Sequence, residues 1–254
     1  MTGVDPPLAN DATPAFAIMD NTGDKSEIQF DLTAGFLSND GANAQLLRPR
    51  LLAQYVAPSG FGGYASFGAA AASGTGTDST FKLGSLEFGG LYQHRLGPEL
   101  EFAARGALAI HTSDGDYVNA IALALSRPAD MASGGIGDWL RFGASPTVHI
   151  GGFFMRVDAG IDVRLDDEGS HPFGHVNAGA GIGNAAWTAA AEFSTMFAIN
   201  SDTGGGGSFK VVGLSTRFNA GSFSPFFGIS HPFDLDGLGT VVNVMAGVNV
   251  PLKI

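Results

Sequence analysis

The chain has 254 residues and a formal net charge of −11, and charged residues make up only 15% of it. An average soluble domain has about a quarter charged residues, so this composition is unusual for one. The acidic balance and the lack of any basic stripe exclude nucleic acid as a partner. No apolar run reaches the roughly 18 residues that a membrane-spanning helix needs, and the absence of cysteine excludes a disulfide framework.

Residues 1–25 are rich in Pro, Asn, Asp and Thr, and we expect them to form an irregular arm that tucks into the interior of a barrel. This segment has neither the basic n-region nor the apolar h-region of a signal peptide. An exported protein of this sequence would therefore be a mature form.

The clearest pattern lies between Asp138 and Asp166. In its second half the apolar residues share one parity, namely Phe153, Met155, Val157, Ala159, Ile161, Val163 and Leu165. Arginine, aspartate and glycine occupy the other parity, and only a β-strand turns a period of two into two faces. The first half alternates in the same way, and Gly151-Gly152 between the halves predicts a two-residue hairpin turn. With that turn Ile150 faces Phe153, so both apolar sets lie on one side.

The same alternation predicts roughly twelve strands. They cover residues 27–37, 45–56, 61–72, 86–93, 100–111, 140–150, 153–165, 175–182, 187–197, 212–218, 225–229 and 242–252. Such strands fit a soluble sandwich with the apolar face inward, or a membrane barrel with that face in lipid and a wet lumen. The connections alternate between tight turns, such as 58–60, and longer polar loops, such as 73–80. This rhythm is typical of outer-membrane barrels and has no counterpart in a soluble sandwich.

Aromatic residues fall near the strand ends, where the interfacial girdles of membrane barrels form. They are Tyr55, Tyr92, Trp139, Phe153, Trp187, Phe197 and Phe218. The longest connection, residues 112–137, contains the apolar run 117–126, which is unusual for an outer loop. We expect this run to fold inward as a short helix that narrows the pore, to cover the barrel mouth or to contact a partner. As a further strand, it would raise the count to fourteen.

The predicted fold class is therefore all-β: a closed antiparallel up-and-down transmembrane β-barrel of about twelve strands, with fourteen as the alternative. Over residues 26–254 the chain resembles the bacterial outer-membrane β-barrel proteins, specifically the small porin-like class of about twelve strands. One departure is the final residue, because such barrels usually end in an aromatic residue and this chain ends in Ile254. The resemblance implies an integral protein of the Gram-negative outer membrane, contacts with outer-membrane lipid and lipopolysaccharide, and a periplasmic position for the arm 1–25.

Charges of both signs are predicted to face the lumen by parity. The basic residues are Arg48, Arg50, Arg105, Arg141, Arg156, Arg164 and Arg217, and the acidic residues are Asp31, Glu87, Glu101, Asp158, Asp162 and Glu192. Because an isolated buried charge is too costly, these groups must pair. Two interpretations stay open: a structural ion-pair network that fills the barrel, or a selectivity lining for small polar or anionic solutes.

Two patterns were tested as chemical sites. His111 and Ser113 have the His-x-Ser spacing of outer-membrane lipid hydrolases, but their parity points into the lumen and no third residue to orient the histidine is evident. The acidic clusters at 166–168 and 234–236 lack the spacing of a calcium site and suit solvated loops, which divalent ions could bridge to lipopolysaccharide. We therefore expect no catalytic residue, no metal and no cofactor.

The leading prediction is passive passage of a small solute past paired charges, with residues 112–137 as the constriction. The second hypothesis is a non-conducting barrel that anchors or scaffolds other envelope proteins through its outer loops or the arm 1–25. An outer-membrane lipid hydrolase that uses His111 and Ser113 is the third.

Overall fold

A computed structural model describes residues 16, 18–19, 25–39, 42–75, 77–112, 137–166, 169–199, 208–233 and 240–252. Its strands are β1 (Glu27–Asn39), β2 (Ala42–Val56), β3 (Phe61–Gly74), β4 (Thr77–Arg95), β5 (Leu100–Ile110), β6 (Asp138–Ile150), β7 (Phe153–Asp166), β8 (Gly169–Gly183), β9 (Trp187–Ala198), β10 (Ser208–Phe218), β11 (Ser224–Phe233) and β12 (Thr240–Pro251). Within these ranges no helix is long and apolar enough to cross a membrane.

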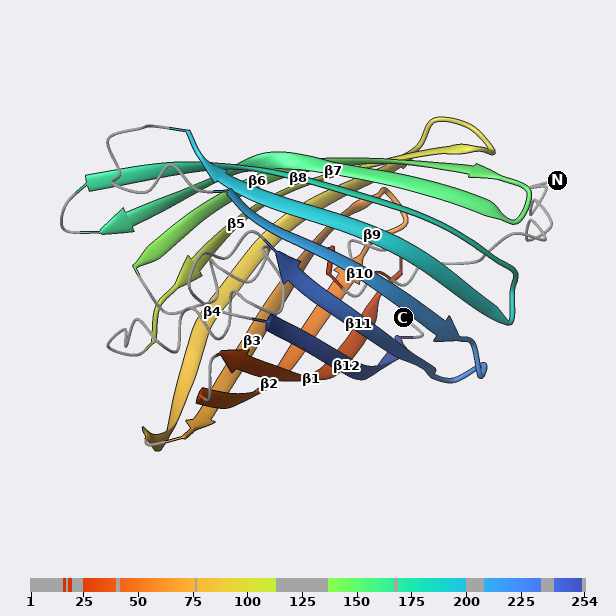
Figure 1. Ribbon diagram of the computed structural model, residues 1–254. Coiled ribbons are helices and arrows are strands. Elements are labelled where there is room, and N and C mark those ends of the chain that lie inside the picture. The colour runs from red at the N-terminus through yellow and green to blue at the C-terminus, as the bar shows by residue number, and fades with distance from the viewer. Residues whose placement is uncertain are drawn as a thin grey trace, which may run out of the picture.

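The twelve described strands form one closed barrel in which each strand pairs with its neighbours in sequence and β1 pairs with β12 (Figure 1). All the pairings are antiparallel. The predicted fold class is thus confirmed with twelve strands. β5 and β6 pair directly with each other, so the connection between them adds no strand to the wall at that place. The apolar run 117–126 lies outside the described residues.

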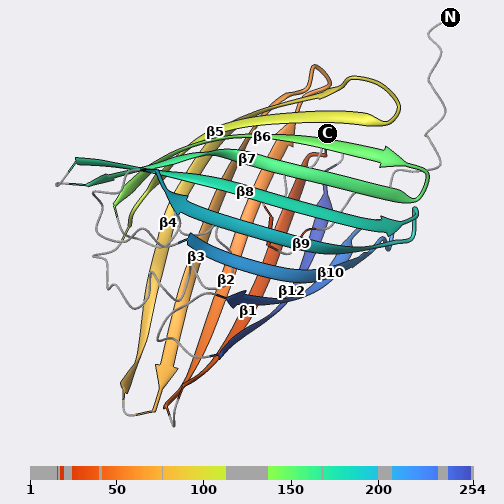
Figure 2. The ribbon, with the colours of Figure 1, turned by 45° about the horizontal axis from the view of Figure 1, so that its top comes forward.

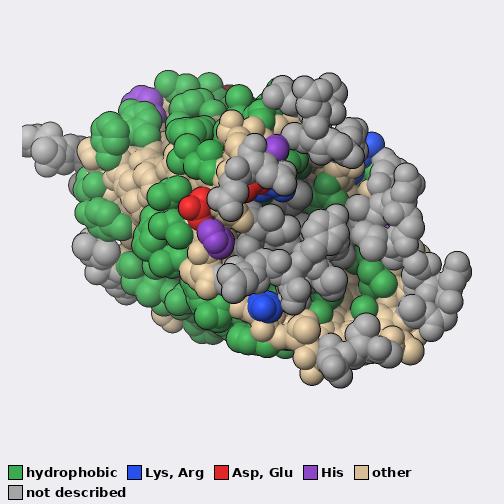
Figure 3. Space-filling model, turned by 90° about the vertical axis from the view of Figure 1, so that its left-hand side faces the viewer, with side chains coloured by type: hydrophobic (Ala, Val, Ile, Leu, Met, Phe, Trp, Pro, Cys, Tyr) green, Lys and Arg blue, Asp and Glu red, His purple; other side chains and the backbone are tan. Residues whose placement is uncertain are grey.

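The barrel is apolar outside and polar inside, as the alternation predicts. On β7 the side chains of Phe153 and Ile161 are 42% and 47% exposed, whereas those of Asp158 and Asp162 are fully buried. Figure 3 shows hydrophobic side chains spread over the flank of the barrel. A soluble domain buries its large hydrophobic residues, so this inverted distribution suits a wall that faces lipid.

Of the residues predicted to form an aromatic girdle, those of outward parity do face outward, such as Tyr55 and Trp187, which are 46% and 37% exposed. Trp139 is an exception, because only 2% of it is exposed and it packs against Ala109 and Phe173 inside the barrel. Its position on β6 has the parity of Arg141, which faces the lumen. Parity therefore decides the direction of this side chain, and nearness to the strand end does not.

At the end with the longer connections, several strands run further than predicted. The tract 73–80, predicted as a loop, belongs mostly to β3 and β4, where Ala72 pairs with Thr80 and Gly74 with Thr77. Figure 2 shows this hairpin projecting from the barrel. Likewise, Asp166 pairs with Gly169 at the β7–β8 connection, which was predicted to be a longer loop. Both faces of these extensions carry small or polar residues, so the hydrogen-bond ladder continues where the hydrophobic alternation stops.

The opposite end of the barrel has the tight turns. Gly151 has a φ of +60° in the two-residue turn between β6 and β7, a conformation that glycine adopts without steric cost. β1 begins and β12 ends at this same end, where the backbone N–H of Leu252 donates to the carbonyl of Ser26 at 2.8 Å. In outer-membrane barrels the end with short turns is the periplasmic one.

Candidate functional site in the barrel lumen

Most of the charged residues predicted to face the lumen lie there, buried. The side chains that are at most 8% exposed are Arg48, Arg50, Arg105, Arg141, Arg156, Arg217, Asp31, Glu87, Asp158, Asp162 and Glu192. Arg164 instead lies near the outer end of β7, where its Nε donates to Asp166 at 2.9 Å and both side chains are about a quarter exposed. Glu101, next to the tight turn that precedes β5, is only partly buried. These two residues lie outside the buried clusters described below.

The first cluster connects β1 and β2. Asp31 and Arg50 are cross-strand partners, and the Nε of Arg50 donates to Oδ2 of Asp31 at 2.9 Å. The amide of Gln29 donates to the same oxygen at 2.9 Å, and a guanidinium nitrogen of Arg48 lies 3.6 Å from Oδ1. The fully buried carboxylate of Asp31 thus forms ion pairs with two guanidinium groups.

The second cluster starts at Asp162 on β7, which lies between a guanidinium and an imidazole. Arg141 of β6, its cross-strand partner, donates from Nε to Oδ1 at 3.0 Å, and Nδ1 of His175 lies 2.7 Å from Oδ2. The other end of the Arg141 guanidinium donates to Glu87 of β4 at 2.8 Å. The intervening strand β5 places the small Ala107 beside Arg141, so this side chain can cross β5 to reach Glu87.

Asp158 is the centre of the same cluster, with five partners on four strands. They are Arg105, Ser145, Arg156, His175 and Asn177. The distances to Asp158 are 3.6 Å for Arg105, 3.5 Å for Arg156 and 3.2 Å for Nε2 of His175. Asn177 donates to Oδ1 at 3.1 Å, and the hydroxyl of Ser145 also donates to this carboxylate.

The position of His175 depends on Gly160, its cross-strand partner on β7. A Cβ at Gly160 would lie 2.7 Å from Cε1 of His175 and 1.9 Å from the carbonyl oxygen of Phe142. The imidazole can therefore lie across β7 and contact both carboxylates only because residue 160 has no side chain. A continuous set of buried polar contacts results, from Tyr64 of β3 to Asn177 of β8.

A third cluster joins side chains of β1, β10 and β12. Glu27 of β1 accepts a hydrogen bond from Asn249 of β12 at 3.0 Å, and a guanidinium nitrogen of Arg217 of β10 lies 3.8 Å away. Charges of both signs therefore line most of the circumference. In a buried setting such pairs contribute little net stability, but the loss of one member is costly because its partner stays charged.

A part of the predicted arm lies inside the barrel. Oε2 of Glu192 on β9 accepts hydrogen bonds from the backbone N–H groups of Ile18, at 2.8 Å, and Met19, at 3.1 Å. The ring of Phe16 packs edge-on against Phe154, with centroids 5.9 Å apart, and the Arg156 guanidinium lies 5.6 Å from the Phe16 centroid. Phe16, Ile18 and Met19 are between 0% and 4% exposed. Residues 1–15, 17 and 20–24 lie outside the described part of the chain.

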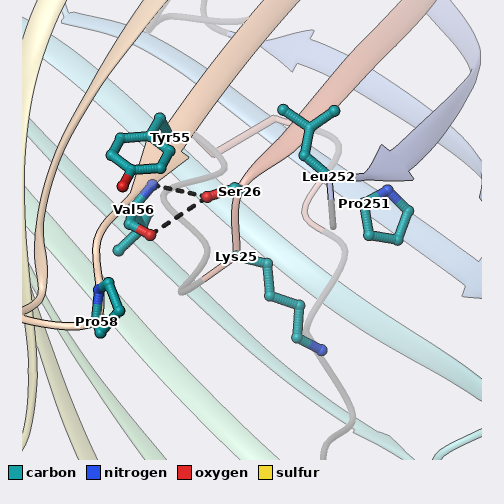
Figure 4. Close-up of a pocket in the computed structure, with 7 residues that line it drawn as sticks. All are labelled: Lys25, Ser26, Tyr55, Val56, Pro58, Pro251 and Leu252. Carbon is teal, nitrogen blue, oxygen red and sulfur yellow. Dashed lines mark hydrogen bonds between the residues drawn. The ribbon is translucent and has the colours of Figure 1, made fainter. Parts of the chain in front are cut away.

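The rim at the tight-turn end shows how the chain enters β1. Lys25, Ser26, Tyr55, Val56, Pro58, Pro251 and Leu252 line a pocket there (Figure 4). The hydroxyl of Ser26 accepts from the backbone N–H of Val56 at 2.9 Å and lies 3.3 Å from its carbonyl oxygen. Gln54 donates from its amide to the carbonyl of Lys25 at 3.0 Å. These contacts fix the start of β1 at the rim.

The predicted hydrolase pair is only half described. Nδ1 of His111 lies 2.7 Å from Oδ1 of Asp138, and both side chains are more than 40% exposed. Asp138 is thus an orienting partner that the sequence did not reveal, but Ser113 lies outside the described residues. Within the described ranges no group of three or more His, Asp or Glu side chains is placed to hold a metal ion. The predicted acidic loop clusters mostly fall on residues outside those ranges.

Several lumen residues were missed from the sequence. His175 and Asn177 have the polar parity of β8, but no spacing to known motifs marked them as members of a network. Tyr64 lies on β3, which is rich in glycine and alanine, and its hydroxyl donates to Glu87 at 2.6 Å. Parity could have identified their direction, whereas their partners depend on the register of three or four strands.

A closed twelve-stranded barrel with an apolar outer wall and a charged interior defines the class: the chain has the fold of the outer-membrane β-barrels. No protein-family model matches the sequence, and no curated protein is similar to it.

Solved structures of this class are similar in fold. The COG4313 outer membrane channel from Pseudomonas putida F1 has a TM-score of 0.58 and 10% identity, over 98% of this chain and 100% of that one. The KdgM porin has a TM-score of 0.56 and 7% identity, over 89% and 99% of the two chains. The translocator domain of the autotransporter NalP from Neisseria meningitidis has a TM-score of 0.55 and 11% identity, over 92% and 90%. At these identities the likeness is one of fold, shared with channels and with a translocator domain.

Proposed function

We propose that the chain is a small-solute channel of the outer membrane, with a lumen suited to small polar or anionic solutes. The observation that carries this proposal is the charge of the inner wall. Acidic and basic side chains form clusters on β1 and β2, on β3 to β8, and on β1, β10 and β12. Buried ion pairs contribute little net stability, so a lumen that only has to be filled gains little from charged groups. Charged linings are what channels use to select solutes.

The mechanism follows from the pairing of these charges. A solute that enters the lumen exchanges hydrogen bonds with guanidinium and carboxylate groups that already have partners, so it is held weakly and can leave again. Because acidic and basic groups occur together in each cluster, we expect only weak preference between anions and cations. The KdgM porin, which is similar in fold, has been solved in complex with oligogalacturonate.

The near-complete burial of the charged side chains favours a second candidate. Asp31, Asp158 and Asp162 have no exposed surface, and six of the arginines are at most 8% exposed. A lumen filled in this way also suits a non-conducting barrel that anchors or scaffolds envelope proteins. In a channel, the same burial means that the described state is narrow, with Phe16, Ile18 and Met19 in part of the lumen and residues 112–137 as the predicted constriction.

Single-channel recording of the purified protein in a planar bilayer separates the two functions, with permeabilities compared across a salt gradient. A channel gives steady steps, and Arg105→Gln shifts the permeability ratio toward cations because it removes a cation beside Asp158. Arg95→Gln is the matched control, since Arg95 is exposed at the end of β4. A silent bilayer with verified insertion would refute the channel and leave the scaffold.

A further inference from the structure

The wall of β7 to β10 contains a hollow that Phe16, Ile18 and Met19 occupy. One row of cross-strand partners runs across these strands: Arg156, Gly179, Glu192 and Gly213. The adjacent row is Phe154, Gly181 and Ala190. Charged side chains thus alternate with glycines in the first row, and the second row is apolar.

The two glycines leave room on either side of Glu192. A Cβ at Gly179 would lie 2.4 Å from Cε1 of Phe16 and 3.0 Å from the sulfur of Met19. A Cβ at Gly213 would lie 3.4 Å from two side-chain carbons of Ile18. Because real Cβ atoms essentially never approach other atoms as closely as the Phe16 contact, the space over Gly179 exists only while that residue is glycine.

Phe16, Ile18 and Met19, the occupant of the hollow, make two kinds of contact with the wall: apolar packing and backbone hydrogen bonds. Phe16 and Met19 pack with Phe154 and Ala190, and two consecutive backbone N–H groups donate to the buried carboxylate of Glu192. The occupant offers no charged side chain among its described residues. Any molecule with an aromatic or branched apolar body and adjacent amide N–H donors presents the same groups to this wall.

We infer that the hollow around Glu192 is a ligand site for short apolar peptides and similar apolar amides, and that Phe16, Ile18 and Met19 occupy it as parts of an intramolecular ligand. The ligand's aromatic group lies over Gly179 beside Phe154, a branched apolar group lies over Gly213, and amide N–H groups donate to Glu192. A ligand without these donors leaves the carboxylate with its Ser215 contact but without the two N–H bonds it now accepts. The site does not require conduction.

The chain's own segment competes with such a ligand. A segment tethered to the barrel has an effective local concentration of the order of millimolar, so a free ligand binds weakly while the segment is seated. Ile18→Asp removes this competition, because it places a second carboxylate next to Glu192 in a dry hollow, and the segment leaves.

The probe is a fluorescently labelled, acetylated tetrapeptide amide with the sequence of residues 16–19, and its binding is followed by fluorescence anisotropy with full-length protein in detergent. The matched control peptide carries methyl groups on the two amide nitrogens that donate to Glu192. We expect the Ile18→Asp protein to bind the probe saturably and at least about tenfold more tightly than the wild type does. We expect it to bind the methylated peptide about 100- to 10,000-fold more weakly than the probe, the range for the loss of two hydrogen bonds to a charged group.

Two second-site changes in the Ile18→Asp protein locate the binding. Gly179→Val fills the hollow and abolishes binding, whereas Gly90→Val, on the outer face of β4 with no atom within 4 Å of the added Cβ, leaves it unchanged. Heat-modifiable migration confirms that each barrel is folded, and the two peptides test the site even if Gly179→Val does not fold.

Equal binding of the methylated peptide, equal binding to the wild type and Ile18→Asp proteins, or no saturable binding to Ile18→Asp would each overturn the inference. If the protein shows no conductance in a bilayer but still binds the probe, the channel function is refuted and the ligand site is supported.

Discussion

Two regions of the lumen satisfy their buried polar groups in different ways. On β3 to β8, each carboxylate finds its partners on the wall itself, as Asp162 does with Arg141 and His175. On β9 and β10, Glu192 accepts two of its hydrogen bonds from Ile18 and Met19. These two residues precede β1 and are not part of the barrel wall. The first region is complete once the barrel closes, whereas the second is completed by a segment that can in principle leave it.

The comparison predicts that damage to the first region destabilises the barrel, and damage to the second releases only the segment. The largest effect is expected for Asp158→Ala. It leaves Arg105 and Arg156 buried without this carboxylate, and breaking a buried ion pair costs about 3–5 kcal/mol. The free energy of unfolding from urea titration in detergent or liposomes measures this.

Asp138→Ala is the control for that substitution, because Asp138 pairs with His111 at an exposed position. Its expected cost is about 0.5 kcal/mol or less. If the two variants were equally stable, the β3–β8 cluster would not be a buried network.

An intermediate effect is expected for Phe16→Ala. The substitution removes the edge-on contact with Phe154 and the contact with the Arg156 guanidinium, so the segment docks less firmly. The barrel itself should keep its urea midpoint, while protease cleavage within residues 1–25 becomes faster and any conductance increases. A loss of barrel stability comparable to that of Asp158→Ala would show that the segment is an integral part of the fold.

A small effect on the free energy of unfolding is also expected for Arg164→Gln. Its partner Asp166 is 23% exposed and Arg164 is 27% exposed, so water screens the pair. We expect a change of about 0.2–1 kcal/mol in the free energy of unfolding, reduced further by salt. A change as large as that of Asp158→Ala would mean that the outer end of β7 belongs to the buried network after all.

The sequence by itself determined the closed barrel, its twelve strands and the direction of almost every charged side chain, because the period of two is local and acts on each strand separately. The alternation stops where strands leave the apolar zone, as in residues 73–80, so the extended β3–β4 hairpin was not predicted. Trp139 shows the strength of the rule, since its parity places it inside although aromatic residues near strand ends usually face the interface.

Only the tertiary structure decided which lumen groups meet. Arg141 reaches Glu87 across β5 because closure and register place the small Ala107 between them, and the position of His175 depends on the absence of a side chain at Gly160. The contact between Ile18 and Glu192 spans 174 positions in the sequence. Period-two reasoning gives a side chain its direction but not its distance from residues on other strands, because that distance is set by the register and curvature of the whole wall.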